Sequence, residues 1–418
     1  MEKTVKIETD VLIDGSLDGP VKNGALVFSG SEIVYAGEAE HAPKADVTIN
    51  EKAVMPGMWD THAHFFGVKT ANPSEWLLTP PTQMAMRVTY DAKTAVEAGI
   101  TGVREAGGIG LDLKYMINDG SVIGPRVFAP GAPLGTTGGH ADMHMVPLDV
   151  LKAFQNPFFG SGIVDGPWEA KKAVRMQLRA GADHIKIMAS GGVMSQRDSP
   201  HHQEFTYEEV KAIVEEAKAK DRIVMAHAHG AAGMKVAVEA GVHSIEHGTW
   251  INEEIIDLMI ERGTFLVPTI YITRRLMELG PKMGAQPEVI EKMKVVMKDH
   301  LNGMKLAYKK GVKIAMGTDI YSSGSDSLVP WGENAKELEN LTEIGMTPLE
   351  AIHASTYNGP LTLGPRAPKT GYLHEGYDAD VLILKEDPLK DITILQNKQN
   401  ILGVFILGEL IINRGLKI

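Results

Sequence analysis

The sequence predicts a (β/α)8 barrel, the TIM-barrel class of α/β fold, with a small β-sandwich domain that both ends of the chain build. Two observations predict this arrangement. Helix-like and strand-like stretches alternate through the middle of the chain, and short strand-like segments fill both ends. No G-x-G-x-x-G or Walker motif stands at a strand-to-helix turn, which disfavours the alternative of an open nucleotide-binding sheet.

The β-sandwich domain is expected to comprise residues 1–55 and 370–418. Near the amino end, VLIDG, GALVFSG and EIVYAG alternate apolar and polar positions between turn residues, as short strands do. The same strand-like pattern recurs near the carboxyl end in DADVLIL, NILGVFILG and ELIINRG. A chain that begins and ends in such segments predicts one composite domain beside a central unit.

Residues 56–369 are expected to form the barrel. Helical stretches such as WEAKKAVRMQLRAG and TYEEVKAIVEEAKAK each precede a short apolar strand, such as HIKIMA or RIVMAHA. This alternation predicts right-handed βαβ units with parallel strands, and about eight such units fit a closed barrel. The glycine-rich and aromatic segment 135–166 interrupts the rhythm, and we expect it to form a loop over the active-site face.

Composition restricts the chemistry. The 418 residues include no cysteine, so histidine, carboxylates and lysine are left to bind any metal. The net charge of −11 and the lack of a long basic run argue against nucleic-acid partners. No membrane-length apolar stretch or signal-like start is present, so a cytoplasmic protein without a membrane partner is expected. A small-molecule substrate and a homo-oligomer are the expected partners.

The strongest local signal is MPGMWDTHAHFFG, which contains His62 and His64. Residues two apart in a strand point the same way, so both imidazoles can bind one ion. A histidine pair without a ligand role is the alternative. Four more polar residues lie in or directly after predicted strands: Lys186 in HIKIM, His227 in RIVMAHA, His247 in SIEHG and Asp319 in GTD. The carboxyl ends of barrel strands meet on one face, so these side chains are expected to converge.

Lys186 and Asp319 suggest what such a site would do. A buried ammonium is costly, so the pKa of a lysine on a buried strand falls, with an ion-paired lysine as the alternative. A neutral amine can react with carbon dioxide to give a carbamate, whose two oxygens can bridge two divalent metals. Asp319 suits the roles of metal ligand and of proton shuttle for a metal-activated water, with a helix N-cap as the alternative.

These residues resemble the pattern of the amidohydrolase superfamily: HAH after PG, a lysine in the middle of the barrel, two later histidines, and aspartate after the last strand. More narrowly, GGHADMH, KIMASGGVMS, AHAHG, IEHG, VPT and MGTD resemble its prolidase-like and imidazolonepropionase-like branch. Relatives there include Xaa-Pro and Lys/Arg dipeptidases, ochratoxin amidohydrolases and phenylurea hydrolases. The resemblance covers essentially the whole chain.

The resemblance implies a binuclear zinc centre. In it, His62, His64 and Asp319 would hold one Zn²⁺, His227 and His247 would hold the other, and N6-carboxylated Lys186 would bridge both. His140, in TGGH, would be a catalytic and substrate-binding residue that polarises the scissile carbonyl, with a solvent-facing loop histidine as the alternative. Tyr271, in VPTIY, would contact substrate, with ordinary packing as the alternative.

The implied reaction is hydrolysis of an amide, peptide-like bond in a dipeptide or an N-acyl or aryl-acyl L-amino acid by metal-activated hydroxide, with Asp319 as catalytic acid and base. A urea, carbamate, cyclic amide or lactone on the same site is the alternative, as is deamination of a heterocycle. A non-catalytic scaffold is disfavoured because all six ligand positions are intact. Glu105 is expected behind the ligands. The other polar residues considered for substrate contact are Arg104, His144, His201, His202, His229, Glu333 and Glu337.

Overall fold

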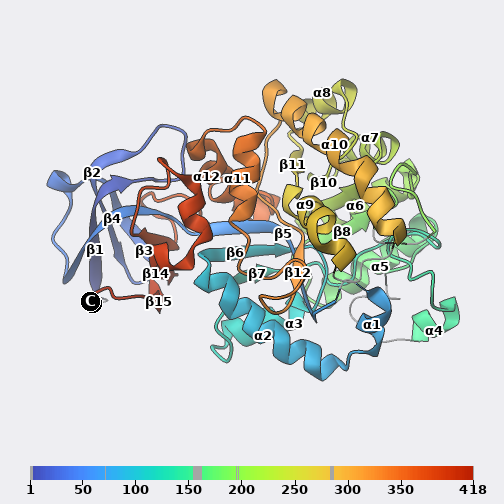
Figure 1. Cartoon of the computed structure of the whole chain (residues 1–418), viewed down its shortest axis with the longest axis horizontal. Helices are drawn as coiled ribbons and strands as arrows, with labels where there is room; N and C mark the ends of the chain where they lie inside the picture. Colours follow the sequence, from blue (N-terminus) through green and yellow to red (C-terminus); the bar gives the residue numbers. More distant parts are fainter. Residues whose placement is uncertain are drawn as a thin grey trace.

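The computed structural model describes residues 3–70, 72–153, 162–193, 195, 197–282 and 287–417. Figure 1 shows two units side by side: a β domain, in which blue strands from the amino end lie beside red strands from the carboxyl end, and a larger α/β unit between them in sequence. Part of the loop predicted at 135–166, namely 154–161, lies outside the described residues.

The two ends of the chain pair in one sheet. In the described part of the chain it has seven strands, in the order β15-β14-β13-β4-β1-β2-β3. β1 and β4 are parallel, and β4 pairs antiparallel with β13, so that Pro56 lies opposite Val381. The β domain predicted from both termini is confirmed, while its boundaries at 55 and 370 stay a prediction. The strands are β1 Thr4–Leu12, β2 Val21–Ser29, β3 Glu32–Glu38, β4 Val47–Pro56, β13 Val381–Leu384, β14 Ile401–Ile406 and β15 Glu409–Asn413.

The strands of the central unit are all paired in parallel. They form two four-stranded sheets among the described residues, β12-β5-β6-β7 and β8-β9-β10-β11. Their bounds are β5 Met58–Val68, β6 Ile100–Glu105, β7 Arg126–Phe128, β8 Ile185–Met188, β9 Val224–Ala228, β10 Ser244–His247, β11 Phe265–Val267 and β12 Ile320–Ser322.

Single parallel bridges join the two sheets at both edges. Leu134, after β7, bridges to Ile187 of β8, and Leu266 of β11 bridges to Ile314. The strands therefore follow one another around a ring, as the predicted (β/α)8 barrel requires. The predicted strand KIAMGT is less regular than expected. Thr318 and Asp319 both donate their backbone N–H to the carbonyl of His62, and the backbone of Asp319 is in the left-handed region, with φ of 61°. This geometry interrupts the ladder before β12.

Helices surround the barrel strands (Figure 1). Several begin at residues that satisfy the free amides of the first turn: Thr206 caps α6 in a capping box with Glu209, and Asn252 caps α8. Every described helix is too short or too polar to cross a lipid bilayer. The helices are α1 Pro73–Leu78, α2 Pro81–Glu97, α3 Gly110–Asn118, α4 Leu148–Ala153, α5 Pro167–Arg179, α6 Tyr207–Lys218, α7 Ala231–Ala240, α8 Glu253–Arg262, α9 Ile270–Leu279, α10 Pro287–Lys310, α11 Lys336–Glu343, α12 Pro348–Ser355 and α13 Asn358–Leu361.

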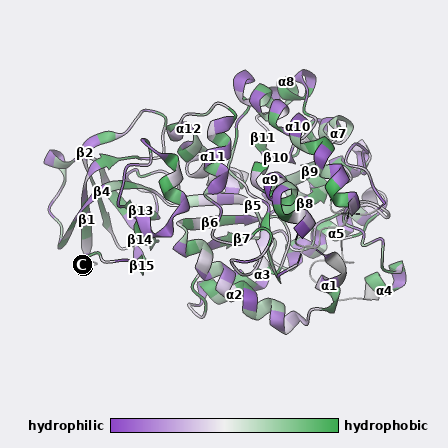
Figure 2. Cartoon of the chain, viewed as in Figure 1, coloured by the Kyte–Doolittle hydropathy of each residue, from purple (hydrophilic) through white to green (hydrophobic). Residues whose placement is uncertain are grey.

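Burial of apolar side chains holds both units together. The main core runs through the barrel and its helices, and a second cluster, which includes Ile7, Phe28 and Phe405, fills the β domain. Helices such as α2 carry both hydrophobic and hydrophilic residues, as expected for helices with one buried face (Figure 2). The core gives rigid support to the strand ends, where the polar residues of the site stand.

Candidate active site

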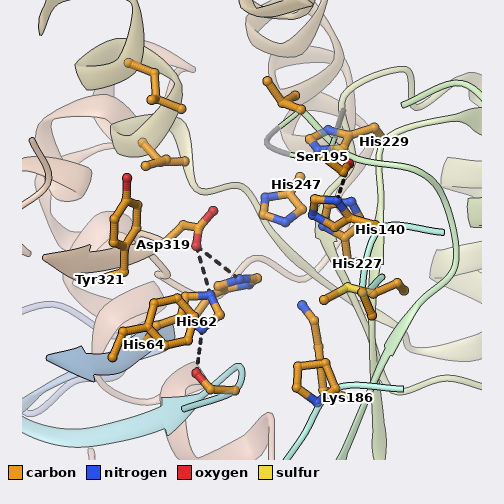
Figure 3. Close-up of a pocket in the computed structure, with 18 of the residues that line it drawn as sticks. His62, His64, His140, Lys186, Ser195, His227, His229, His247, Asp319 and Tyr321 are labelled. Carbon is orange, nitrogen blue, oxygen red and sulfur yellow. Dashed lines mark hydrogen bonds and ion pairs between the residues drawn. The ribbon is translucent and has the colours of Figure 1, made fainter. Parts of the chain in front are cut away.

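A cavity opens where the carboxyl ends of the barrel strands meet. Figure 3 shows side chains from separate strands pointing into it. The convergence predicted from the sequence occurs, because residues from β5, β8, β9 and β10 and from the segment before β12 share one space. All predicted metal ligands and His140 line the cavity: His62, His64, His140, Lys186, His227, His247 and Asp319.

His62, His64 and Asp319 form the first candidate ligand group. One ligand atom from each lies within 4.8 Å of the others. The Nε2 atoms of His62 and His64 lie 3.6 and 3.1 Å from the same oxygen of Asp319. The Nδ1 of His64 is hydrogen bonded to the carbonyl of Gly107 at 2.7 Å, so Nε2 is the ring nitrogen that faces the group. Two imidazoles and a carboxylate are a donor set that could hold a divalent metal ion.

Two of the candidate ligands have strained backbone conformations, which help to set the direction of their side chains. Asp319 and His247 both have positive φ, 61° and 71°, at the points where their strands end. Such conformations are costly for residues other than glycine and cluster at functional sites. Burial would raise the pKa of Asp319, but the hydrogen bond with His64 and the nearby charges of His62 and His64 lower it below its usual value. Asp319 is therefore held as a carboxylate facing the imidazoles.

Three histidines form the second candidate ligand group: His227, His229 and His247, again with ligand atoms within 4.8 Å of one another. The Nδ1 atoms of His229 and His247 are hydrogen bonded to the hydroxyls of Thr249 and Thr269, both at 2.7 Å. Burial lowers the pKa of each of the three well below the usual value, which favours the neutral ring that a metal requires. His229, the second histidine of AHAHG, is thus closer to the site than its motif alone indicates.

Lys186 lies between the two groups, on β8. Its side chain is 1% exposed, and burial lowers the pKa of its amine to about 8. Its Nζ makes no hydrogen bond or ion pair within the described residues, although the charges of Glu246 and Asp319 oppose the shift. A substantial neutral fraction near neutral pH is what carbamate formation requires. The alternative of an ion-paired lysine does not fit this geometry.

A buried ion pair supports His62 from beneath the cavity. The Nδ1 of His62 lies 2.8 Å from Oε2 of Glu246, and Nη2 of Arg104 lies 2.9 and 3.0 Å from the two Glu246 oxygens. Burial would raise the pKa of Glu246, but the charge of Arg104 and the hydrogen bond with His62 lower it to about 2. Arg104 is therefore committed beneath the ligands, so it is not available to bind a substrate carboxylate. Glu246 was not among the residues expected from the sequence, although Glu246 and the polar Ser244 lie on the same face of a buried strand.

We expect Glu246→Gln to weaken metal binding by about tenfold to a hundredfold, the usual cost of losing a carboxylate partner behind a ligating histidine. The uncharged amide no longer favours a proton on Nδ1 of His62, and Arg104 loses its counter-charge. Competition with a chromophoric chelator measures this directly. Glu239→Gln, on the exposed end of α7, is the matched control and should leave affinity unchanged. Equal affinity in Glu246→Gln and the control would contradict the role.

His140 stands at the rim of the second group. Its ring stacks on His227, with centroids 4.5 Å apart, and its Nδ1 is hydrogen bonded to the hydroxyl of Ser195 at 2.8 Å (Figure 3). It therefore faces the cavity, and the alternative of a solvent-facing loop histidine does not fit. His144 also lines the cavity, whereas His201 and His202 are not among its lining residues.

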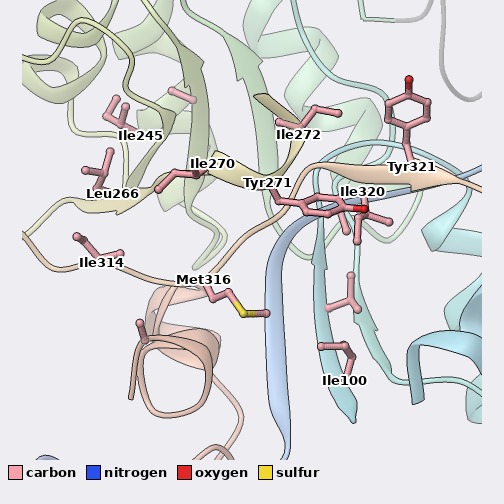
Figure 4. Packing of buried hydrophobic residues seen from close by; sticks show 14 of the residues in the cluster. Ile100, Ile245, Leu266, Ile270, Tyr271, Ile272, Ile314, Met316, Ile320 and Tyr321 are labelled. Carbon is pink, nitrogen blue, oxygen red and sulfur yellow. The ribbon is translucent and has the colours of Figure 1, made fainter. Parts of the chain in front are cut away.

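Tyr271 lies apart from the site. Its side chain is 2% exposed and packs in the hydrophobic core beside Ile270 and Ile320 (Figure 4), while its hydroxyl donates to Glu333 at 2.6 Å. It is not among the residues that line the cavity, so the geometry gives the predicted substrate contact no support and favours the packing alternative. Tyr321 of β12 lines the cavity instead (Figure 3). The hydrogen bond from Tyr271 also occupies the carboxylate of Glu333, so Glu333 is not available to a substrate cation.

Glu337 is buried and takes a structural role. Its carboxyl accepts the backbone N–H groups of Ile270 and Tyr271, at 2.8 and 2.7 Å, and the side-chain amide of Asn340. It thus caps the first turn of α9 and is available neither to a substrate cation nor to solvent. Glu105 is likewise buried and accepts the N–H of Phe65 and Gly110, behind the ligands as expected.

Burial raises the pKa of Glu337 to about 8, so its contribution to stability should depend on pH. A carboxyl that binds its proton more tightly when folded stabilises the protein fully below its unfolded pKa. That contribution is lost as pH rises through the folded pKa. We expect the difference in unfolding temperature between wild type and Glu337→Gln to shrink by several degrees from pH 5 to pH 8.5. Glu339→Gln, on the same helix, should show no trend. A difference that grows with pH would contradict the assignment.

Comparison with known proteins agrees with this site. The sequence model of the amidohydrolase family matches residues 53–411. The chain belongs to the amidohydrolase family. Ochratoxinase of Aspergillus niger is 39% identical over 432 residues, which cover 99% of this amidohydrolase and 88% of that protein. Its crystal structure has a TM-score of 0.90 to this chain at 38% identity, covering 99% of this chain and 96% of that one.

A second solved structure extends the similarity. A Xaa-Pro dipeptidase with methionine bound in its active site has a TM-score of 0.87 and 34% identity, over 97% of this amidohydrolase and 99% of that chain. The resemblance inferred from the motifs is confirmed, and this amidohydrolase is a hydrolase enzyme rather than a scaffold.

Proposed function

We propose that this amidohydrolase cleaves the amide bond of an N-acyl or aryl-acyl L-amino acid, or of a dipeptide with a bulky apolar part, using two divalent metals, zinc in the first instance. The single observation that carries the proposal is the convergence of His62, His64, His227, His247 and Asp319 around the buried amine of Lys186. The names of the relatives, an ochratoxinase and a Xaa-Pro dipeptidase, support an amide substrate.

The chemistry of the donor set fits two metal ions. His62, His64 and Asp319 would hold one, His227 and His247 the other, and a carbamate on Lys186 would supply the shared anion. Nδ1 of His62, His64 and His247 is already hydrogen bonded, which leaves Nε2 of each ring for a metal ion. The first group also includes an anionic carboxylate that offsets positive charge. When bound, two such ions would make the scissile carbonyl more electrophilic and the attacking water more acidic.

Side chains of the protein then transfer the proton and stabilise the developing negative charge. Asp319 takes the proton of the attacking water on its carboxylate and later delivers it to the leaving amine nitrogen. His140 donates a hydrogen bond to the carbonyl oxygen, where negative charge develops during attack. Glu246 and Gly107 hold His62 and His64 in place throughout.

The walls of the cavity support an apolar substrate. The lining includes aliphatic and thioether side chains and aromatic rings, and no arginine is among the lining residues of the described chain. Apolar lining with a few convergent polar groups is typical of sites for small organic ligands. The residues of these walls are Phe66, Trp76, Met188, Val193, Ile272, Leu276, Met293, Val296 and Tyr321.

The proposal is tested by comparing matched amides on zinc-loaded protein. N-benzoyl-L-phenylalanine should be hydrolysed with kcat/KM at least about tenfold above N-benzoylglycine, since burial of a phenyl ring contributes about 1.5–3 kcal/mol. The D-enantiomer should react more slowly, and a chelator should abolish turnover in every case. Aryl ureas and lactones complete the panel. Turnover of ureas or lactones with no cleavage of any amide would contradict the proposal.

A further inference from the structure

We propose that Ser195, Asp198 and Lys292 form a positioning device that fixes the ring of His140 through its Nδ1, leaving Nε2 to the substrate. The inference rests on the proposed function for the role of His140, and goes beyond it by assigning three residues outside the ligand set. They come from the loop after β8 and from α10, whereas His140 comes from the loop after β7. Figure 3 shows the contact between His140 and Ser195.

Counting hydrogens gives the direction of each bond. The carboxylate of Asp198 accepts the N–H of Gly192 at 2.7 Å and the hydroxyl of Ser195. Because Ser195 has a single hydrogen and gives it to Asp198, its oxygen can only accept from His140, where Nδ1 lies 2.8 Å away. Nδ1 therefore carries a hydrogen. The remaining ring nitrogen, Nε2, is the one available to a ligand in the cavity that the ring lines. It donates to a carbonyl oxygen when the ring carries a hydrogen on both nitrogens, as an imidazolium whose charge Asp198, 3.6 Å from Nδ1, offsets.

Lys292 holds the loop that carries this device. Its Nζ donates to the carbonyls of Gly192, Ser195 and Asp198, at 3.1, 2.8 and 3.0 Å, and lies 3.4 Å from Oδ1 of Asp198. One ammonium thus links α10 to three carbonyls of a single loop and balances the charge of Asp198, whose side chain is only 4% exposed. Charge-assisted bonds of this kind are stronger than neutral ones.

Gly192, the second glycine of the SGG sequence in this loop, leaves room for the ring of His140. A Cβ on Gly192 would lie 2.0 Å from Cε1 of His140, far inside contact distance, so the ring packs against bare backbone. The ring also stacks on His227, and the backbone N–H of His140 donates to Glu204 at 2.6 Å. The ring is held by packing and by one directed hydrogen bond, which defines where Nε2 points.

A double-mutant cycle tests the device on zinc-loaded protein with the amide of the proposed function. We expect Asp198→Asn and Lys292→Met each to lower kcat by about tenfold to a hundredfold, part of the roughly 10²–10³ that loss of an oxyanion donor costs. KM and zinc content should stay within about threefold, because the metal ligands are untouched. In a His140→Ala background, neither change should lower kcat further. Lys294→Met, two residues along α10, is the matched control and should match wild type, because Lys294 pairs only with Glu291 among the residues that the structure describes.

Two outcomes would overturn the inference. An equal fold-loss with and without His140 would show that the loop acts by another route. A crystal structure of the zinc-loaded protein, with Nδ1 of His140 beyond hydrogen-bond distance of Ser195, would also overturn it, and needs no activity. Ser195→Ala, the smallest change, replaces Lys292→Met if that variant does not fold. Wild-type protein that cleaves no amide would instead refute the proposed function, while the crystal structure would still decide the positioning of His140.

Discussion

Asp319→Asn is expected to lower kcat by about a thousandfold, within the roughly 10²–10⁴ that a positioned general acid and base contributes. Asparagine has nearly the same shape but can neither accept the proton of the attacking water nor deliver one to the leaving amine. Because the structure holds Asp319 as a carboxylate between His62 and His64, its charge rather than its bulk is what the site uses. Steady-state kinetics on the zinc-loaded variant measure the loss.

The loss must come from chemistry rather than from unfolding or an empty site. Circular dichroism and zinc content should therefore accompany the kinetics. Asp326→Asn, an exposed position in the loop that follows β12, is the control and should retain full activity. Turnover near the wild-type value in Asp319→Asn would rule out the shuttle role.

Lys186→Ala should be the most damaging substitution of all. It removes the amine between the two ligand groups and with it the proposed bridging carbamate, so the two groups lose the anion that they would share. We expect zinc content to fall below two ions per chain, and kcat to fall by at least about a thousandfold, which corresponds to about 4 kcal/mol of transition-state stabilisation.

A small carboxylate distinguishes a bridge from simple disruption. Acetate or propionate can enter the space left by the Lys186 side chain and offer two oxygens to the metals, so either should restore part of the activity and of the zinc content of Lys186→Ala. Lys186→Arg should not respond, because guanidinium stays cationic and fills the space. An alanine variant with two zinc ions and normal turnover would refute the bridge.

The fold was predictable because its elements carry strong local signals. Strands such as HIKIM and RIVMAHA are short apolar runs between helices with clear starts, as at Thr206 and Glu209 of α6. The segment KIAMGT was predicted less well. Its hydrogen-bond ladder is interrupted because the backbone of Asp319 is in the left-handed region and because the N–H groups of Thr318 and Asp319 both bond to the carbonyl of His62. This tertiary feature has no sequence signal beyond the GTD motif.

The convergence of the candidate ligands was predictable for a topological reason. Every parallel strand of a barrel presents its carboxyl end on the same face, so polar residues at strand ends meet whatever their separation along the chain. His62 and Asp319 are 3.6 Å apart although more than 250 positions separate them. Spacing along a strand was enough to pair His62 with His64.

Apart from Glu105, the residues behind the candidate ligands were not predictable, because a side chain at the end of a strand can point in several directions. Arg104 precedes Glu105, the last residue of β6, yet its side chain extends beneath the candidate ligands to meet Glu246 of β10. Tyr271 and Glu337 meet at the start of α9, where neither a strand period nor a helix period specifies a partner. The loop residues around Ser195 and Asp198 depend on Lys292 of a distant helix.

Anomalous diffraction from crystals of the zinc-loaded protein tests the central claim most directly. The account predicts two peaks at the zinc absorption edge, one among His62, His64 and Asp319 and one beside His227 and His247. Electron density for a carboxylate on Nζ of Lys186 should connect them. A single peak, or an unmodified Lys186 whose amine points away from both groups, would contradict the account.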